Sequence, residues 1–100
     1  MSVARIVVEP LAKQDIREAR DWYSEKGQGL SELFRDELIA VFDFIAREPL
    51  GATTAFGQTR LKPMHRFPYV IGDIYHQGIV HITGVRHGRQ QMSAFSDRES

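Results

Sequence analysis

The side chains that could act on a phosphate or move a proton lie mostly in the second half of this sequence. All four histidines are found there, next to arginines and a lysine that could hold an anionic group. This basic set consists of Arg60, Lys62, His65, Arg66, Arg86, His87 and Arg89. Cationic side chains bind phosphates, and a histidine can donate or accept a proton near neutral pH. The set therefore predicts either a site for phosphate chemistry or a solvated basic edge of a sheet.

Arg86, His87 and Arg89 form the tightest cluster of this set, at the point where a predicted strand passes into a loop. Functional residues are frequent at such places. Arg60 and Lys62 are two residues apart on another predicted strand, so their side chains should point the same way. Such a group could hold phosphates, and His87 could act as a general acid or base near neutral pH.

Other kinds of site find no support. The histidines match no recognised spacing of metal ligands and the chain has no cysteine, so we expect no metal. The sequence also lacks a glycine-rich phosphate loop and a Ser-His-Asp arrangement, so we expect no cofactor.

Trp22 and Tyr23 stand together near the end of a predicted helix. These residue types are enriched among the side chains that dominate binding interfaces, so the pair could anchor a partner. The alternative is that both rings close the core against the turn that follows.

The length of 100 residues and the apolar content of 42% predict one domain over residues 1–100. No stretch approaches about 18 uninterrupted apolar residues, so we expect no membrane span. The N-terminus lacks the layout of a signal peptide, and the absence of cysteine suits a cytoplasmic protein.

The formal net charge is zero, but the charges are unevenly placed. Residues 1–50 carry seven Lys/Arg and ten Asp/Glu, whereas residues 51–100 carry six and three. An anionic partner should therefore meet the C-terminal half. Overall neutrality weighs against a protein that is held on the ribosome by phosphate contacts.

The apolar pattern of the first half predicts a strand over residues 3–9 and then two helices. The first helix should run from Pro10 to about Ser24, and the second from Leu30 to Arg47, with a break at Gly27-Gln28-Gly29. The expected buried stripe of the first helix is Leu11, Ile16, Ala19 and Trp22/Tyr23. That of the second is Leu30, Leu33, Phe34, Leu38, Val41, Phe42 and Ile45. The short break should make the helices an antiparallel hairpin, with Phe34, Leu38 and Phe42 fully buried.

After a loop at residues 50–58, three β runs are predicted at residues 59–64, 69–76 and 79–86, the last two joined by Gln77-Gly78. Gly72 and Gly84 mark bulges or close approaches within these strands. Residues 90–95 could add an edge strand or a turn, and residues 96–100 a frayed tail. The order β-α-α-β-β-β predicts an α+β fold, with a mainly antiparallel sheet and the helical hairpin on one face.

In this order the elements resemble the RelE/ParE superfamily of type II toxin–antitoxin toxins, over about residues 6–98. The resemblance rests on first-helix and second-helix residues, a Pro-x-Gly exit, an Arg that opens the next strand, and motifs near the C-terminus. These are Ala12, Asp15, Ile16, Tyr23, Gly29-Leu30, Phe34, Leu38, Pro49, Gly51, Arg60, Phe67-Pro68-Tyr69, Val85-x-His87-x-Arg89 and Arg98. RelE-type nucleases carry an Arg near the position of Pro68-Tyr69, and Phe95 stands where an aromatic hydroxyl could have served. The chain therefore looks more like the ParE branch.

The resemblance implies a plasmid-stabilising toxin that inhibits DNA gyrase without chemistry of its own and is neutralised by direct binding of a ParD-like antitoxin. Its contact residues would be Trp22, Arg86, His87, Arg89 and Arg98. A homodimer or a toxin–antitoxin hetero-oligomer is compatible with this family. Two alternatives stay open. One is a RelE-like ribosome-dependent mRNA endonuclease, in which Arg60, Lys62 and Arg89 would hold phosphates and His87 would be the acid or base. The other is a degenerate toxin that serves only as an interaction module.

Overall fold

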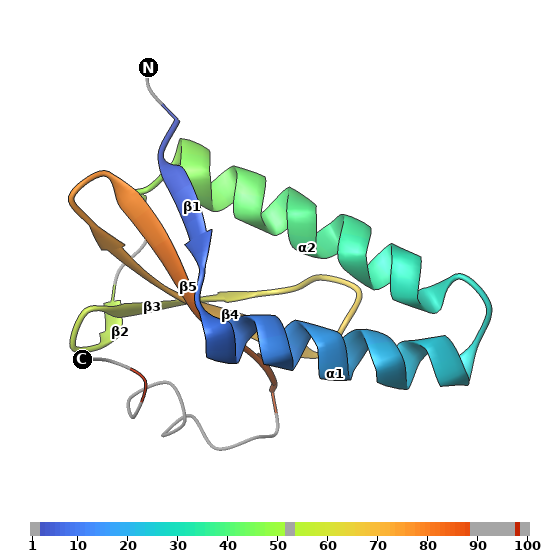
Figure 1. Cartoon of the computed structure of the whole chain (residues 1–100). Coiled ribbons are helices and arrows are strands. Elements are labelled where there is room, and N and C mark those ends of the chain that lie inside the picture. The colour runs from blue at the N-terminus through green and yellow to red at the C-terminus, as the bar shows by residue number, and fades with distance from the viewer. Residues whose placement is uncertain (1–2, 52–53, 89–97, 99–100) are drawn as a thin grey trace.

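The structure, a computed structural model, describes residues 3–51, 54–88 and 98 of the chain. Its elements follow in the order β1 (Arg5–Val8), α1 (Pro10–Lys26), α2 (Leu30–Arg47), β2 (Thr54–Phe56), β3 (Thr59–Pro63), β4 (Tyr69–His76) and β5 (Ile79–His87) (Figure 1). The α+β class and the predicted order of strand, helical hairpin and sheet are confirmed.

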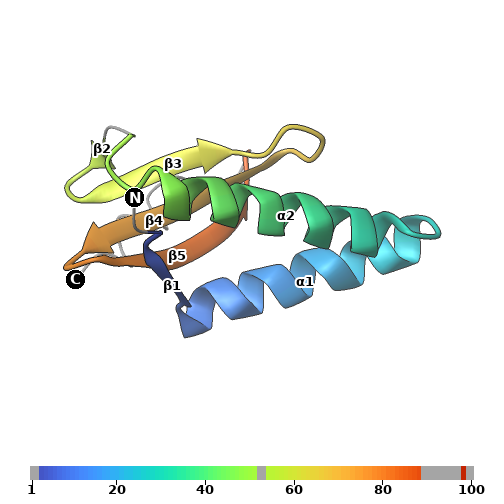
Figure 2. The same cartoon turned by 90° about the horizontal axis from the view of Figure 1, so that it is seen from above.

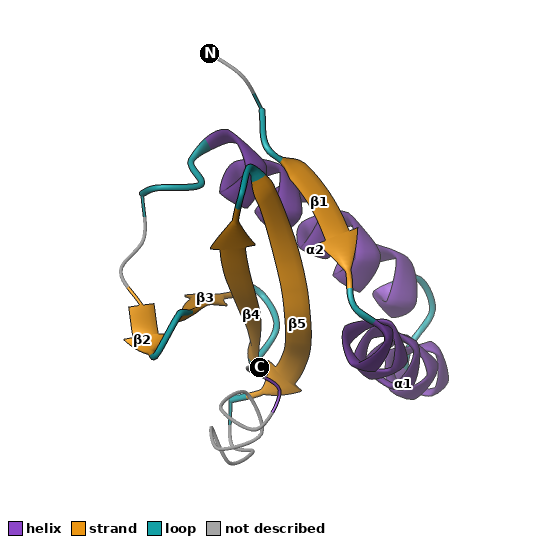
Figure 3. Ribbon diagram, turned by 60° about the vertical axis from the view of Figure 1, so that its left-hand side comes forward, coloured by secondary structure: helices purple, strands orange, loops and turns teal. Residues whose placement is uncertain are grey.

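The strands form one sheet in the spatial order β1-β5-β4-β3-β2. Only the pairing of β1 with β5 is parallel, and the three other pairings are antiparallel. Both helices lie on the same face of this sheet (Figures 2 and 3). The prediction of a mainly antiparallel sheet with the hairpin on one face is therefore confirmed.

The predicted loop at residues 50–58 was wrong in part, because it contains the short strand β2. This strand pairs antiparallel with β3, with Thr54 opposite Arg60. A three-residue edge strand depends on hydrogen bonds to its neighbour rather than on its own apolar pattern, so the local sequence did not indicate it. The further strand or turn predicted at residues 90–95 lies outside the described residues.

The turn between β4 and β5 is the predicted two-residue hairpin, with His76 opposite Ile79. Gln77 and Gly78 have φ angles of 51° and 80°, and two positive values are the signature of a type I′ turn. The bulge predicted near the strand glycines is also present. Gly84 lies opposite Gly72 and Ile82 opposite Asp73, which leaves Thr83 as an extra residue in β5.

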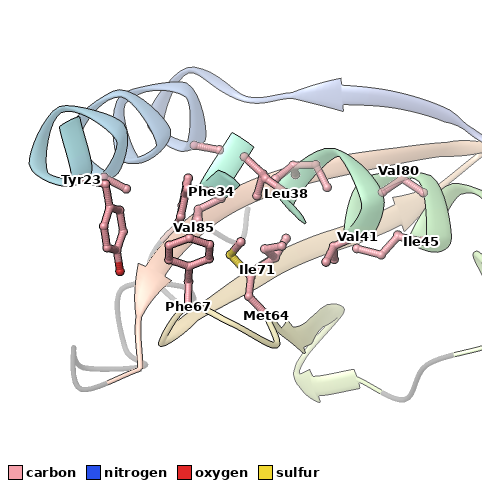
Figure 4. Packing of buried hydrophobic residues seen from close by; sticks show 13 residues of the cluster. Tyr23, Phe34, Leu38, Val41, Ile45, Met64, Phe67, Ile71, Val80 and Val85 are labelled. Atoms are coloured by element: carbon pink, nitrogen blue, oxygen red, sulfur yellow. The ribbon is translucent and has the colours of Figure 1, made fainter. Parts of the chain in front are cut away.

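This bulge decides which β5 side chains reach the core. Side chains alternate between the two faces of a strand. In a regular strand, Val80 and Ile82 would therefore point to one face and Val85 to the opposite face. The extra residue changes the alternation, and all three side chains are buried in one core. Together with Ile71 of β4 they belong to the same core as Phe34, Leu38, Val41 and Ile45 of α2, and Figure 4 labels all of these residues except Ile82.

Three details of the predicted helical stripes were wrong. Leu11 and Leu33 are 49% and 45% exposed, and Phe42 is only partly buried. On α1 the buried positions are instead Ala12, Asp15, Ala19 and Tyr23. The large apolar residues set the predicted stripe, whereas the buried face of α1 carries two alanines, a tyrosine and one carboxylate with several donors.

Neither helix that the structure describes carries an apolar stretch long enough to cross a lipid bilayer.

Candidate binding site

A cleft of about 410 Å³ opens between α1 and the adjoining ends of β4 and β5. Its lining combines aromatic rings with charged groups: Asp15, Glu18, Ala19, Trp22, Tyr23, Pro68, Tyr69, Val85, Arg86 and His87. Three of the predicted contact residues, Trp22, Arg86 and His87, come together here from segments that are more than 60 residues apart in the chain. The fold thus builds one site from them.

Four of the ten residues that line the cleft carry aromatic rings: Trp22, Tyr23, Tyr69 and His87. The Tyr69 ring meets the His87 ring edge to face at 5.4 Å between centroids, and Trp22 meets Tyr23 in the same way at 5.0 Å. Burial raises the pKa of the Tyr69 phenol above its ordinary value of 10.0, so this hydroxyl stays neutral. Such walls favour a flat or apolar side chain over a strongly hydrated group.

The two residues of the Trp22–Tyr23 pair have different environments. Tyr23 is buried and stacks on Phe34 at 5.5 Å, as expected for a core residue. Trp22 is 51% exposed, so the interpretation that it closes the core is wrong. The Lys26 ammonium lies 4.8 Å from the centre of the Trp22 ring. Trp22 is therefore the exposed aromatic edge of the cleft.

Behind the cleft, the buried carboxylate of Asp15 joins α1 to the last strand. It accepts hydrogen bonds from the Val85 backbone N–H at 3.0 Å, from the Arg98 guanidinium at 2.6 Å and from the Arg86 guanidinium at 3.3 Å. Arg98 also donates to the carbonyl oxygen of Thr83. The pairing of β1 with β5 ends at Ile82. Just beyond that point, the side chains of Asp15 and Arg98 satisfy backbone groups of β5.

Arg98, a predicted contact residue, is therefore an anchor in this structure, with its side chain only 14% exposed. It lines a second cleft of about 600 Å³ together with Glu9, Pro10, Leu11, Gln58, Ile74, His76, His81 and Thr83. Arg89, the remaining predicted contact residue, lies outside the described residues.

Of the predicted nuclease set, Arg60 and Lys62 are not brought to His87, and Arg89 lies outside the described residues. Arg60 is buried between β3, β4 and the end of α2, where it donates to Asp73 Oδ1 from Nε at 2.7 Å and from Nη2 at 2.5 Å. Its third nitrogen donates to the carbonyl oxygen of Pro49. Burial raises the pKa of the Asp73 carboxyl above its ordinary value of 3.8, and the hydrogen bond and charge of Arg60 oppose this effect without cancelling it.

Lys62 points to the same side of β3 as Arg60, as predicted, but that side faces a helix. Its ammonium lies 4.4 Å from the centre of the Phe44 ring on α2. Arg60 is thus held in an ion pair and Lys62 on a ring, both away from the cleft that contains His87.

Sequence reasoning gave no structural role to two acidic residues that position the site. Asp15 was named only for its match to the family's first helix, and Glu37 of α2 was not singled out. The Glu37 carboxylate accepts the backbone N–H groups of His65 at 2.6 Å and Arg66 at 3.0 Å, and so ties the β3–β4 connection to the helix. The donors lie 28 to 83 residues away from these acids, so no local pattern could have indicated either role.

We predict that Asp15→Asn lowers the free energy of unfolding by about 1.5–3 kcal/mol, because hydrogen bonds to a partly buried charge are lost. Urea denaturation followed by circular dichroism measures the change. The matched control is Asp36→Asn, since Asp36 forms an exposed pair with Arg35 and should change stability by less than about 0.5 kcal/mol. Equal effects of the two substitutions would contradict the anchoring role of Asp15.

Among the residues that the structure describes, no group of three or more His, Cys, Asp or Glu side chains is placed to hold a metal ion.

A comparison with curated proteins found no significant match. A comparison with protein families found that residues 6–92 match the family described as the ParE toxin of the type II toxin-antitoxin system, parDE. The match spans every helix and strand of the fold except the first residue of β1, and it includes the whole cleft. This chain therefore belongs to the ParE family of type II toxins.

Proposed function

We propose that this toxin inhibits DNA gyrase by binding it, and that the cleft between α1 and the ends of β4 and β5 is the principal binding surface. Membership of the ParE family supports the proposal, and it implies a cognate antitoxin as partner. We also propose that this antitoxin neutralises the toxin by direct binding. An exposed Trp beside an Arg and a His is the composition expected of an interface anchor.

The observation that carries the choice of binding over cutting is the burial of Arg60. Cleavage of RNA requires cationic groups around the reacting phosphate, together with an acid and a base. Arg60 is only 5% exposed and is occupied by Asp73, and Lys62 covers Phe44. His87 has Arg86 as its cationic neighbour in the cleft. This arrangement supports a surface that recognises a partner.

The test is a supercoiling and cleavage assay with purified gyrase, plasmid and toxin, with and without the antitoxin. We expect loss of supercoiling and accumulation of linear plasmid, both reversed by the antitoxin. The antitoxin is best sought as the product of a neighbouring gene.

We predict that Trp22→Ala raises the toxin concentration needed for half inhibition of gyrase by at least about tenfold, because interface Trp residues commonly dominate binding energy. The matched control is Leu33→Ala, an exposed apolar residue of α2 outside the cleft, which should leave inhibition unchanged. Equal behaviour of the two variants would remove the cleft from the gyrase interface.

Unaffected gyrase would contradict the proposed target and favour the mRNA endonuclease, whose candidate acid or base is His87, in contact with Tyr69. In vitro translation with mapping of mRNA ends would then show cuts that disappear in His87→Ala. Absence of both activities, with no growth defect on expression without an antitoxin, would point to an interaction module.

A further inference from the structure

We propose that Arg86 is the receptor for a carboxylate of the antitoxin, and that a flat apolar side chain next to that carboxylate packs against Trp22 and Tyr69. This inference rests on the proposed direct binding of the antitoxin; it places that binding at the cleft and names the chemistry that the cleft selects. The occupant is a polypeptide segment that joins an acidic group to an aromatic or large aliphatic one.

The Arg86 guanidinium makes fewer hydrogen bonds than it could donate. Its Nε is buried and has no hydrogen-bond partner among the residues that the structure describes, while Nη1 lies 3.3 Å from Asp15 Oδ1. A buried donor without an acceptor carries a cost in free energy. Arg60 provides the contrast, because all three of its nitrogens donate to oxygen atoms. Arg86 would therefore gain more than Arg60 from a new acceptor.

The Asp15 carboxylate has other hydrogen-bond donors besides Arg86. The Asp15 carboxylate keeps the Val85 N–H at 3.0 Å and the Arg98 guanidinium at 2.6 Å if Arg86 turns away. The side chain of Arg86 is 24% exposed and already lines the cleft. Rotation toward a ligand in the cleft therefore exchanges one long contact for short charge-assisted hydrogen bonds.

The residues around Arg86 decide which anion the cleft would bind. A guanidinium can pair in a bidentate manner with a carboxylate or with a phosphate. Glu18 lines the same cleft, and its negative charge disfavours the dianion of a phosphomonoester more than the monoanion of a carboxylate. The rings of Trp22 and Tyr69 supply an apolar surface next to Arg86. A carboxylate attached to an apolar side chain fits these features better than a phosphomonoester does.

The experiment is a titration of the full chain with small probes, read by fluorescence. Trp22 is the only tryptophan in the chain and lies in the cleft, so its emission reports directly on occupancy. The probes are N-acetylphenylalanine, with a carboxylate and a ring, its neutral amide N-acetylphenylalaninamide, and phenyl phosphate. We expect the acid to bind about tenfold more tightly than the amide and more tightly than phenyl phosphate.

The variant Arg86→Gln should remove the preference for the acid and leave binding of the amide unchanged. The matched control, Arg35→Gln, changes an exposed arginine of α2 and should keep the preference. If Arg86→Gln does not fold, NMR of the wild-type protein replaces it. The Arg86 Nε–H resonance should then shift on addition of the acid and not of the amide.

Equal binding of acid and amide to the wild-type protein would overturn the inference, as would a preference for the acid that survives in Arg86→Gln. Tighter binding of phenyl phosphate would also overturn it and would indicate a partner that carries a phosphomonoester, such as a phosphorylated side chain. Because the gyrase assay uses none of these probes, gyrase inhibition without a preference for the acid would refute this inference alone.

Discussion

Replacement of Arg60 by methionine is expected to lower the free energy of unfolding by about 3–5 kcal/mol, because it leaves the buried carboxylate of Asp73 without its partner. The side chains of Arg60 and Asp73 are 6% and 3% exposed, so water cannot compensate for the lost ion pair. A domain of this kind is commonly stable by only about 5–15 kcal/mol, so the variant should be close to unfolding. Urea denaturation followed by circular dichroism measures the loss.

The control is the double variant Arg60→Met/Asp73→Leu, which removes both charges together. Replacement of a whole buried pair by apolar residues is often neutral or stabilising, so most of the lost stability should return. The double variant should also inhibit gyrase as the wild type does, since the cleft contains neither residue. Loss of activity in a folded double variant would instead give Arg60 or Asp73 a direct functional role.

The Arg60–Asp73 pair should also make the stability of the protein depend on pH, and the direction of the shift in the Asp73 pKa sets the sign of that dependence. Burial raises the pKa of its carboxyl above 3.8, so the folded protein binds this proton more tightly than the unfolded chain does. The stability that this group contributes is complete below pH 3.8 and is lost as the pH rises through the raised pKa. In Arg60→Met the hydrogen bond and charge of Arg60 no longer oppose the rise in the pKa of Asp73. The difference in free energy of unfolding between this variant and the wild type should therefore become smaller as the pH falls toward 3.8.

Replacement of Phe34 by alanine is expected to cost about 3–5 kcal/mol, the usual range for a buried Phe. Phe34 is fully buried and lies 5.2 Å, between ring centroids, from both Phe67 and Tyr69. Because Tyr69 is a wall of the cleft, the cavity left by Phe34 should also weaken partner binding. Thermal and urea denaturation measure the first effect, and the gyrase assay on folded protein measures the second.

Phe44→Ala is the matched control, because Phe44 lies on the same helix but is 52% exposed. It loses the contact with the Lys62 ammonium, which is worth about 0.5–1 kcal/mol at an exposed site. A loss of similar size in both variants would mean that α2 contributes through helix formation and not through its packed face.

The sequence predicts most of the fold because its strongest signals are local. The period of Phe34, Leu38, Val41 and Ile45 predicts α2 and its buried face, and Gln77-Gly78 predicts the turn between β4 and β5. Both features depend on residues that are close in the chain. The edge strand β2 has no such signal, since its hydrogen bonds belong to its pairing with β3.

The candidate site is less predictable because it depends on side chains that meet across the fold. Trp22, Arg86 and His87 could be selected by residue type, and the structure brings them into one cleft. The same reasoning placed Arg60 in a nuclease set, because a sequence cannot show that Asp73 lies opposite it. Asp15 was missed for the same reason, since its donors Val85 and Arg98 come from the other end of the chain.

The parallel pairing of β1 with β5 has a consequence for the newly made toxin on the ribosome. Arg5 lies opposite Ile79 and Val8 opposite Ile82, so β1 has no partner strand until residues 79–82 have been translated. Closure of so long a loop is slower than formation of the local helical hairpin. A chain that terminates before Val85 would lack Val85, Arg86 and His87, and with them the cleft. If the proposed function holds, such a fragment should not inhibit gyrase.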